Sequence, residues 1–375
     1  MPFGLIFIAT PPFKTFSFMH DKSNEYYKFG TEMNMNTRSV VFVAVLLLLA
    51  TSLRAQLTLG EGVTISFASV AEGKRLLTRR DDFVERMSPF DRAARLKTDK
   101  DVSERQYLEF VGQNVLEWND AEKQKVNSAF LGIQKTLEAM ALPFPEKVLI
   151  IKTTGREEGG AAYTRANAIV LPQVDLKAPA AGIQNKICHE LFHIMSRANP
   201  DLREKLYAAI GFAKCNEVAF PPELKSRKIT NPDAPRNDYC IRVKVGVKEQ
   251  WAIPILFSSA EKYDVDRGGE FFKYLQFQLL LVERPNNGPT VRPMVDGQKP
   301  NLVGMQHVSG FFEQVGKNTR YIIHPEEVLA DNFALLVVGR RNLPSPEVIE
   351  KIQAILKDRE TAEQGAAADA ARPRR

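Results

Sequence analysis

The sequence predicts an α+β fold with a mixed sheet, and four consecutive stretches support this prediction. Apolar residues recur every three or four positions through residues 119–140, which is the period of an amphipathic helix. Two short apolar runs follow, at residues 147–152 and 168–171, and turn-forming residues bound them as they bound strands. A second helix is expected at residues 179–197, where Asn199-Pro200 ends it. This order indicates helices packed on a sheet.

The remaining stretches give weaker patterns. Residues 56–118 form an N-terminal region without a clear period, apart from a charged segment at 81–96 that suggests a solvated helix interrupted at Pro89. Residues 271–283 are too apolar for a loop and fit either a strand or a buried helix. The other expected elements are a helix at 201–212, a loop at 213–238, a hairpin at 239–257, a long loop at 284–300, a helix at 325–338 and a disordered tail at 357–375.

Length and composition fit a globular chain of one large or two modest domains. The chain has 375 residues, of which 44% are hydrophobic, and a net charge of +6. The positive charge is spread along the chain, and no basic motif is interleaved with aromatic residues. A nucleic-acid partner is therefore not expected.

An apolar run near the N-terminus indicates export. Residues 40–50 are all apolar, follow Arg38 and precede small and polar residues, which is typical of a secretory signal peptide. We expect the signal peptide at residues 35–55 and interpret residues 1–34 as an over-extended reading frame. The run is shorter than the roughly 20 residues of a membrane span, and a short retained anchor is the alternative. The mature chain is expected to be secreted or periplasmic, without a stable membrane span.

Three cysteines would enter the exported compartment: Cys188, Cys215 and Cys240. An odd number allows at most one intramolecular disulfide, and Cys215 with Cys240 is the plausible pair. Cys188 belongs to the helix at 179–197, where we expect it to be buried as a small apolar residue.

The helix at 179–197 contains the pattern His-Glu-Leu-Phe-His. Residues four apart lie on one face of a helix, so His189 and His193 can offer imidazole nitrogens to one metal ion. Glu190 lies about a quarter-turn away, where its carboxylate can reach a water molecule on the metal. Zinc lowers the pKa of such a water to about 7, and Glu190 is the expected catalytic base. The alternative is a helix whose two histidines merely lie at the surface.

A downstream helix can complete this site. Catalytic zinc usually has three protein ligands and one open position. Glu327 and Asp331 are four residues apart, so Glu327 could be the third ligand and Asp331 could hydrogen-bond the far nitrogen of a ligand histidine. Glu326 would then point to the side, and His324 and His307 are the alternative third ligands.

Hydrolysis of a carbonyl compound also needs a group that stabilises the tetrahedral oxyanion. Tyr321, shortly before the downstream helix, is the first candidate for this catalytic role, ahead of His307 and His324. The alternative is that Tyr321 is an aromatic residue packed at the entrance of the helix.

The His-Glu-Leu-Phe-His pattern with a downstream Glu-x-x-x-Asp helix resembles the gluzincins, a family of zinc metallopeptidases. The resemblance rests on these two short helices and on the strand order before them. It implies that His189, His193 and Glu327 bind zinc. It also implies that Glu190 is the catalytic glutamate and that Asp331 is the acidic residue four positions beyond the third ligand.

The same resemblance implies an architecture and an activity. Residues 119–200 would form a zincin lobe, in which the strand just before the metal helix offers a free edge to an extended peptide. Residues 201–356 would form a second, helical lobe that supplies the third ligand across a cleft. The implied activity is zinc-dependent hydrolysis of peptide or related amide bonds outside the cytoplasm, on a peptide or protein substrate. A secreted non-catalytic binding protein on the same scaffold and a cell-wall amidase are the alternatives.

Overall fold

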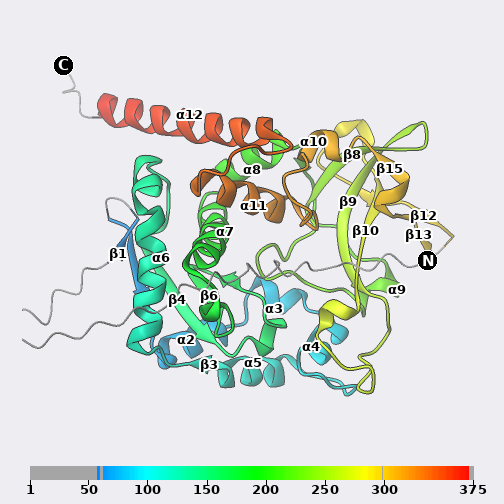
Figure 1. Ribbon diagram of the computed structural model, residues 1–375. Helices are drawn as coiled ribbons and strands as arrows, with labels where there is room; N and C mark the ends of the chain where they lie inside the picture. The colour runs from blue at the N-terminus through cyan, green and yellow to red at the C-terminus, as the bar shows by residue number, and fades with distance from the viewer. Residues whose placement is uncertain (1–56, 60–61, 298, 371–375) are drawn as a thin grey trace, which may run out of the picture. The chain divides into compact units, whose positions relative to one another are not determined.

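The described part of the chain is a mixed α/β structure with a mixed β-sheet and several helices (Figure 1). The computed structural model describes residues 57–59, 62–297 and 299–370, with side chains as far as residue 359. These residues belong to one compact unit that begins at Gln56. The expected over-extended start at 1–34 and signal peptide at 35–55 lie outside the described residues. None of the helices described is long and apolar enough to cross a membrane.

The mixed sheet has six strands in the order β1-β2-β4-β6-β5, with β3 beside β4. Strands β2, β4 and β6 are parallel, whereas β1, β3 and β5 join their neighbours in antiparallel orientation. The predicted strands at 147–152 and 168–171 are confirmed as β4 and β6. The bounds are Leu57–Thr58 for β1, Thr64–Phe67 for β2, Val115–Leu116 for β3, Lys147–Thr153 for β4, Tyr163–Arg165 for β5 and Ala168–Pro172 for β6.

Both faces of this sheet are covered by helices. Along β4, Val148 and Ile150 point into the core shared with α6 and α7, whereas Ile151 packs with the helices on the opposite face. This alternation follows the two-residue period of a strand, and burial of both faces explains the continuous apolar runs in the sequence. The helices concerned are α2 (Val70–Leu77), α5 (Glu104–Gln113), α6 (Asp120–Ala139) and α7 (Ala180–Ala198). Helices α6 and α7, which were predicted before and after the two strands in the sequence, are confirmed.

The second half of the chain contains a seven-stranded antiparallel sheet, not the expected helical lobe. The predicted hairpin is confirmed as β8 and β9, and the ambiguous stretch at 271–283 ends in strand β10. The other strands have only two or three residues, too few to show a period in the sequence. The bounds are Phe212–Lys214 for β7, Tyr239–Val245 for β8, Lys248–Ser258 for β9, Leu275–Glu283 for β10, Arg292–Pro293 for β11, Leu302–Val303 for β14 and Val308–Ser309 for β15. A separate pair joins β12 (Val295–Asp296) to β13 (Lys299–Pro300).

The charged segment at 81–96 is largely buried, although Glu85 stays exposed, where the sequence suggested a solvated surface. It forms α3 (Asp82–Arg86) and α4 (Pro89–Arg95), with the expected interruption at Pro89. The side chains of Asp91 and Arg95 are fully buried because Arg95 donates to Asp91 at 2.5 Å and to both carboxylate oxygens of Glu158 at 2.8 and 2.9 Å. The partner that makes this burial possible lies 63 positions away in the sequence.

The remaining helices are α8 (Pro200–Ala209), α9 (Pro222–Lys225), α10 (Phe312–Val315), α11 (Pro325–Val337) and α12 (Pro346–Ala370). Helices α8 and α11 agree with the predicted helices at 201–212 and 325–338, although α8 ends earlier. Helix α12 continues through Ala370, so the tail predicted to be disordered from residue 357 is helical over most of its length. Its Ala- and Glu-rich composition has high helix propensity, which outweighs the low apolar content on which the prediction rested.

The cysteines correct one expectation. All three are free thiols, so the expected disulfide between Cys215 and Cys240 is not formed. The Cys240 thiol donates to the Ala213 carbonyl at 3.6 Å, and Arg284 donates to the Cys240 sulfur at 3.1 Å. Cys188 is buried in the core beside α6, as expected, and burial raises the pKa of its thiol to about 12.

Candidate metal centre

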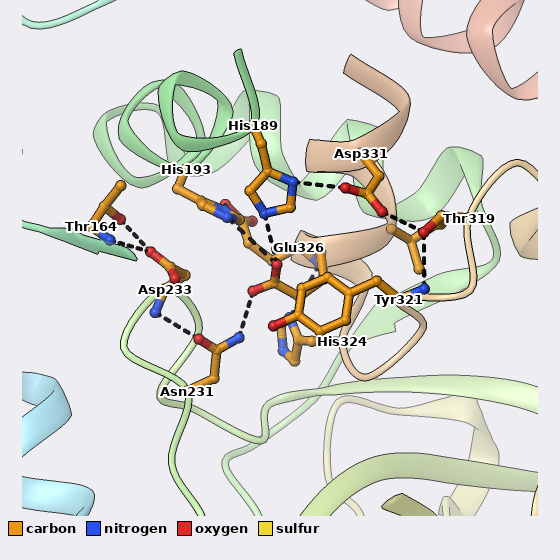
Figure 2. A network of polar contacts seen from close by, with 12 residues as sticks. Thr164, His189, His193, Asn231, Asp233, Thr319, Tyr321, His324, Glu326 and Asp331 are labelled. Carbon is orange, nitrogen blue, oxygen red and sulfur yellow. Dashed lines mark hydrogen bonds and ion pairs between the residues drawn. The ribbon is translucent and has the colours of Figure 1, made fainter. Parts of the chain in front are cut away.

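Helices α7 and α11 pack against each other and bring the two sequence patterns together (Figure 2). The rings of Phe192 on α7 and Phe333 on α11 lie 5.7 Å apart, centroid to centroid, in the core between the helices. His324 caps the start of α11 and Pro325 occupies its first position, where a fixed φ angle and a missing N–H favour a helix start. This start places the next two residues, Glu326 and Glu327, beside the histidines of α7.

Three side-chain atoms converge between the helices. The Nε2 atoms of His189 and His193 lie 3.1 and 3.6 Å from the same oxygen, Oε2 of Glu327. Ligand atoms on a tetrahedral zinc ion, each about 2.0–2.2 Å from it, lie about 3.3–3.5 Å from one another. The observed separations bracket this range, so the three residues can hold one such ion without a large rearrangement.

The other nitrogen of each histidine is held by a carboxylate. His189 Nδ1 lies 2.8 Å from Asp331 Oδ1, which is the partner predicted from the sequence. His193 Nδ1 lies 3.1 Å from Glu326 Oε1, a contact that the sequence reasoning missed by placing Glu326 to the side. A carboxylate on Nδ1 favours the tautomer with its proton there, which leaves the lone pair of Nε2 available to a metal ion.

Two buried polar atoms at this centre have no hydrogen-bond partner among the described residues: His193 Nε2 and Glu190 Oε2. His193 is fully buried and Glu190 is 3% exposed, so water is largely excluded from both. Unpaired buried polar atoms are rare because each costs about 1–3 kcal/mol. A metal ion on His193, with a water molecule beside it for Glu190, would satisfy both atoms, so the donor set fits a metal.

The electrostatics of the centre favour a cation. Burial lowers the pKa of His189, but its hydrogen bonds to the carboxylates of Asp331 and Glu327 outweigh this effect and raise that pKa to about 10. The pKa of His193 is also raised, because the carboxylates of Asp233, Glu327 and Glu326 outweigh its burial. The carboxylates thus create a negative potential at the ring nitrogens. A metal ion and a ring proton respond to this potential in the same way.

Asp233 is a further carboxylate at the centre that the sequence reasoning missed. Its carboxylate lies with Glu190 and His193 in a second group whose ligand atoms are within 4.8 Å of one another. His193 Nε2 can bind only one ion, so the two groups are alternatives. Asp233 Oδ1 already accepts hydrogen bonds from Thr164 N at 2.7 Å and Thr164 Oγ1 at 2.5 Å. The group with Glu327 is therefore the better metal site, because both its histidines have carboxylate partners and its oxygen faces both rings.

The other predicted residues take different places. Tyr321 is partly buried beside the centre, with its ring 6.2 Å from that of His189 (Figure 2). Desolvation, followed by the charges of Glu327 and Asp233, raises the pKa of its hydroxyl. His324 Nδ1 accepts the backbone N–H of Glu326 as the cap of α11, and His324 belongs to neither group of candidate ligands. His307 is exposed in a turn and belongs to neither group.

The free edge near the centre differs from the expected one. Strand β6, which directly precedes α7, is paired on both sides, to β4 and to β5. The edge strand is β5, a three-residue strand that was too short to recognise from its sequence. The expected free edge at residues 168–171 is therefore wrong, and Thr164 of β5 is the edge residue that faces the site.

Comparison of the chain with protein-family models, with curated proteins and with solved structures finds no match.

Proposed function

We propose that the protein is a zinc-dependent hydrolase of peptide or related amide bonds, similar in its site to the gluzincins. The observation that carries this proposal is the convergence of His189 Nε2, His193 Nε2 and Glu327 Oε2, two imidazoles and a carboxylate from two packed helices. Two histidines and one glutamate with an open position are a known ligand set of catalytic zinc. Glu190 beside this set adds the base that a purely structural metal site does not need.

When bound, zinc would supply a Lewis acid that polarises the scissile carbonyl and makes a water molecule more acidic. Glu190 accepts the proton of the attacking water at its unpaired Oε2 and passes it to the nitrogen of the leaving amine. Burial, followed by the charge of Asp233, raises the pKa of Glu190 to about 7. The low-polarity surroundings of Glu190 thus favour its protonated form, which eases its acceptance of a proton from the water.

The chain's other residues position the reacting groups. Asp331 and Glu326 hold the two imidazoles in orientation through their Nδ1 atoms. Tyr321 is the proposed donor to the oxyanion, since the raised pKa of its hydroxyl keeps it protonated at neutral pH. A zincin-like arrangement of sheet and metal helix, a peptide or protein substrate and secretion to the outside of the cytoplasm belong to the same proposal.

Zinc analysis of purified variants tests the ligand set. We expect one zinc per chain in the wild type, loss of zinc in His189→Ala and Glu327→Ala, and retention in His307→Ala, a matched control at an exposed histidine. Retention of zinc in Glu327→Ala would exclude Glu327 as the third ligand. A zinc-free wild type that takes up none on titration would overturn the proposal.

The catalytic role of Glu190 needs a separate variant. Glu190→Gln keeps the shape of the side chain and every metal ligand, so zinc content should be unchanged. Hydrolysis of a labelled unfolded protein such as casein should fall by a factor of about 10²–10⁴, the usual contribution of a general base. Full peptidase activity in Glu190→Gln would refute the mechanism.

A further inference from the structure

The outer edge of β5 carries the hydrogen-bonding groups with which an extended peptide could pair. Thr164 faces Ile169 of β6 in register, and its N–H points away from the sheet toward the metal centre. The carbonyl of Ala166, in the turn after β5, faces the same side. An exposed N–H and C=O along a sheet edge are the groups that β-strand addition uses. Here both groups are already engaged.

The groups that engage this edge come from the chain itself. Asp233 Oδ1 accepts the Thr164 N–H at 2.7 Å, and Arg197 donates to the Ala166 carbonyl at 2.9 Å. Arg197 also donates to Thr164 Oγ1 at 2.8 Å and to the Asp233 carbonyl at 3.4 Å. The short segment of residues 231–235 therefore occupies the position beside β5 that an added strand would take.

The 231–235 segment also reaches the metal centre. Asn231 Nδ2 donates to Glu327 Oε1 at 2.5 Å. The Asn231 side chain also accepts the backbone N–H of Asp233 at 3.0 Å (Figure 2). Just beyond the segment, Arg236 forms an ion pair with Asp82 at 2.6 Å. The segment is thus fixed at the centre, at the edge strand and on α3.

In some proteins a segment that covers an edge strand has the single role of preventing aggregation. Such a cover needs no contact with a buried ligand carboxylate, and it needs no carboxylate within 4.8 Å of Glu190 and His193. The segment makes both contacts, so it lies across the position of the substrate as well as across the edge. Building on the proposed function, we propose that the outer edge of β5 is a pairing edge for an extended peptide and that the 231–235 segment masks it until a substrate displaces it.

Selectivity between substrates tests the mask. Fluorescein-labelled casein offers an extended chain, whereas an N-blocked dipeptide amide is too short to pair with β5. In Asp233→Ala the ratio of kcat/KM for casein to that for the dipeptide amide should rise about tenfold. This factor corresponds to about 1.4 kcal/mol, close to the net free energy of one hydrogen bond to a charged group. An unchanged or lower ratio would overturn the mask.

Arg236→Ala loosens the segment from its far end and leaves every residue at the metal centre in place. Its activity on the dipeptide amide should equal that of the wild type, while its activity on casein should rise by a smaller factor than in Asp233→Ala. A fall in casein cleavage would instead show that the segment helps to bind the substrate, which contradicts the mask.

Binding without turnover separates this inference from the proposed function. Fluorescence anisotropy of labelled casein can be measured with Glu190→Gln and with the double variant Glu190→Gln/Asp233→Ala. The mask predicts about tenfold tighter binding to the double variant, even if the wild type hydrolyses neither substrate and the proposed function fails. Equal affinities would overturn the mask, whatever the activity of the wild type.

Discussion

Glu326 gives the sharpest test of how the metal centre is built, because the sequence offered no reason to single it out. Its carboxylate is 3% exposed and receives three groups: His193 Nδ1 at 3.1 Å, Ser196 Oγ at 2.8 Å and the hydroxyl of Tyr207. The Glu326→Gln variant keeps the shape and the burial of this side chain and removes only its charge and one acceptor oxygen. We expect it to weaken zinc binding although Glu326 is not a proposed ligand.

The size of the effect follows from the contacts. The hydroxyls of Ser196 and Tyr207 can rotate and accept a hydrogen bond from the new amide. The Nδ1–H of His193 can only donate. In the variant it therefore either donates to the neutral amide oxygen of the new glutamine or faces the amide N–H. Loss of such an orienting carboxylate typically costs 10–100-fold in metal affinity, or about 1.4–2.7 kcal/mol. Because Glu326 is almost fully buried, water cannot replace the lost interaction, and we expect a loss of zinc affinity in the upper half of this range.

Asp331→Asn is the matched control, since Asp331 holds the other histidine in the same way. The side chain of Asp331 is 29% exposed, so water can replace part of the lost interaction, and a loss of about tenfold is expected. Zinc affinity can be measured by competition with a chromophoric chelator at constant pH, with circular dichroism to confirm folding. Unchanged zinc affinity in Glu326→Gln, or a larger loss in Asp331→Asn, would refute the reasoning.

Two further predictions concern stability. Burial lowers the pKa of Lys228 to about 8, so between pH 8 and its usual value the unfolded chain binds more protons than the folded chain. The free energy of unfolding should therefore rise by up to about 3 kcal/mol across this interval, and Lys228→Met should flatten the rise in urea titrations. Arg95→Met leaves the buried carboxylates of Asp91 and Glu158 uncompensated and should cost about 3–5 kcal/mol. Arg105→Met, at an ion pair whose arginine is 81% exposed, should change stability by less than about 1 kcal/mol in the same assay.

The parts of the centre that could be predicted from the sequence are those that one helix fixes by itself. His189 and His193 are four residues apart, as are Glu327 and Asp331, and helix geometry places each pair on one face whatever surrounds it. Glu326 was missed because neighbouring helical residues point about 100° apart. Both neighbours reach the site because Glu327 faces Nε2 of His193 and Glu326 faces Nδ1 of the same ring.

Residues that act through tertiary contacts left no periodic signal. Asn231 and Asp233 lie in a proline-rich loop, and only the folded chain brings them to Glu327 and Thr164. Strand β5 has three residues, too few for an alternation that a sequence can reveal. Arg95 also left no such signal, because its burial depends on the carboxylate of Glu158, 63 positions away in the sequence. The sequence could predict helix α7 and strands β4 and β6, but it could not predict that the 231–235 segment lies beside β5.

The charge around the two histidines gives a reason, independent of any motif, to expect a divalent ion. Five carboxylates surround the rings, from Glu190, Asp233, Glu326, Glu327 and Asp331. Protonation of both rings would offset two of these charges, but it would place two like charges on imidazoles whose centroids are only 4.8 Å apart. It would also remove the Nε2 lone pairs with which the rings can bind a metal ion. One divalent ion supplies the same two charges at a single point, keeps both Nδ1–H groups on their carboxylates and satisfies the unpaired His193 nitrogen. The charge of these carboxylates therefore favours a divalent ion between the two rings, in agreement with the proposed zinc site.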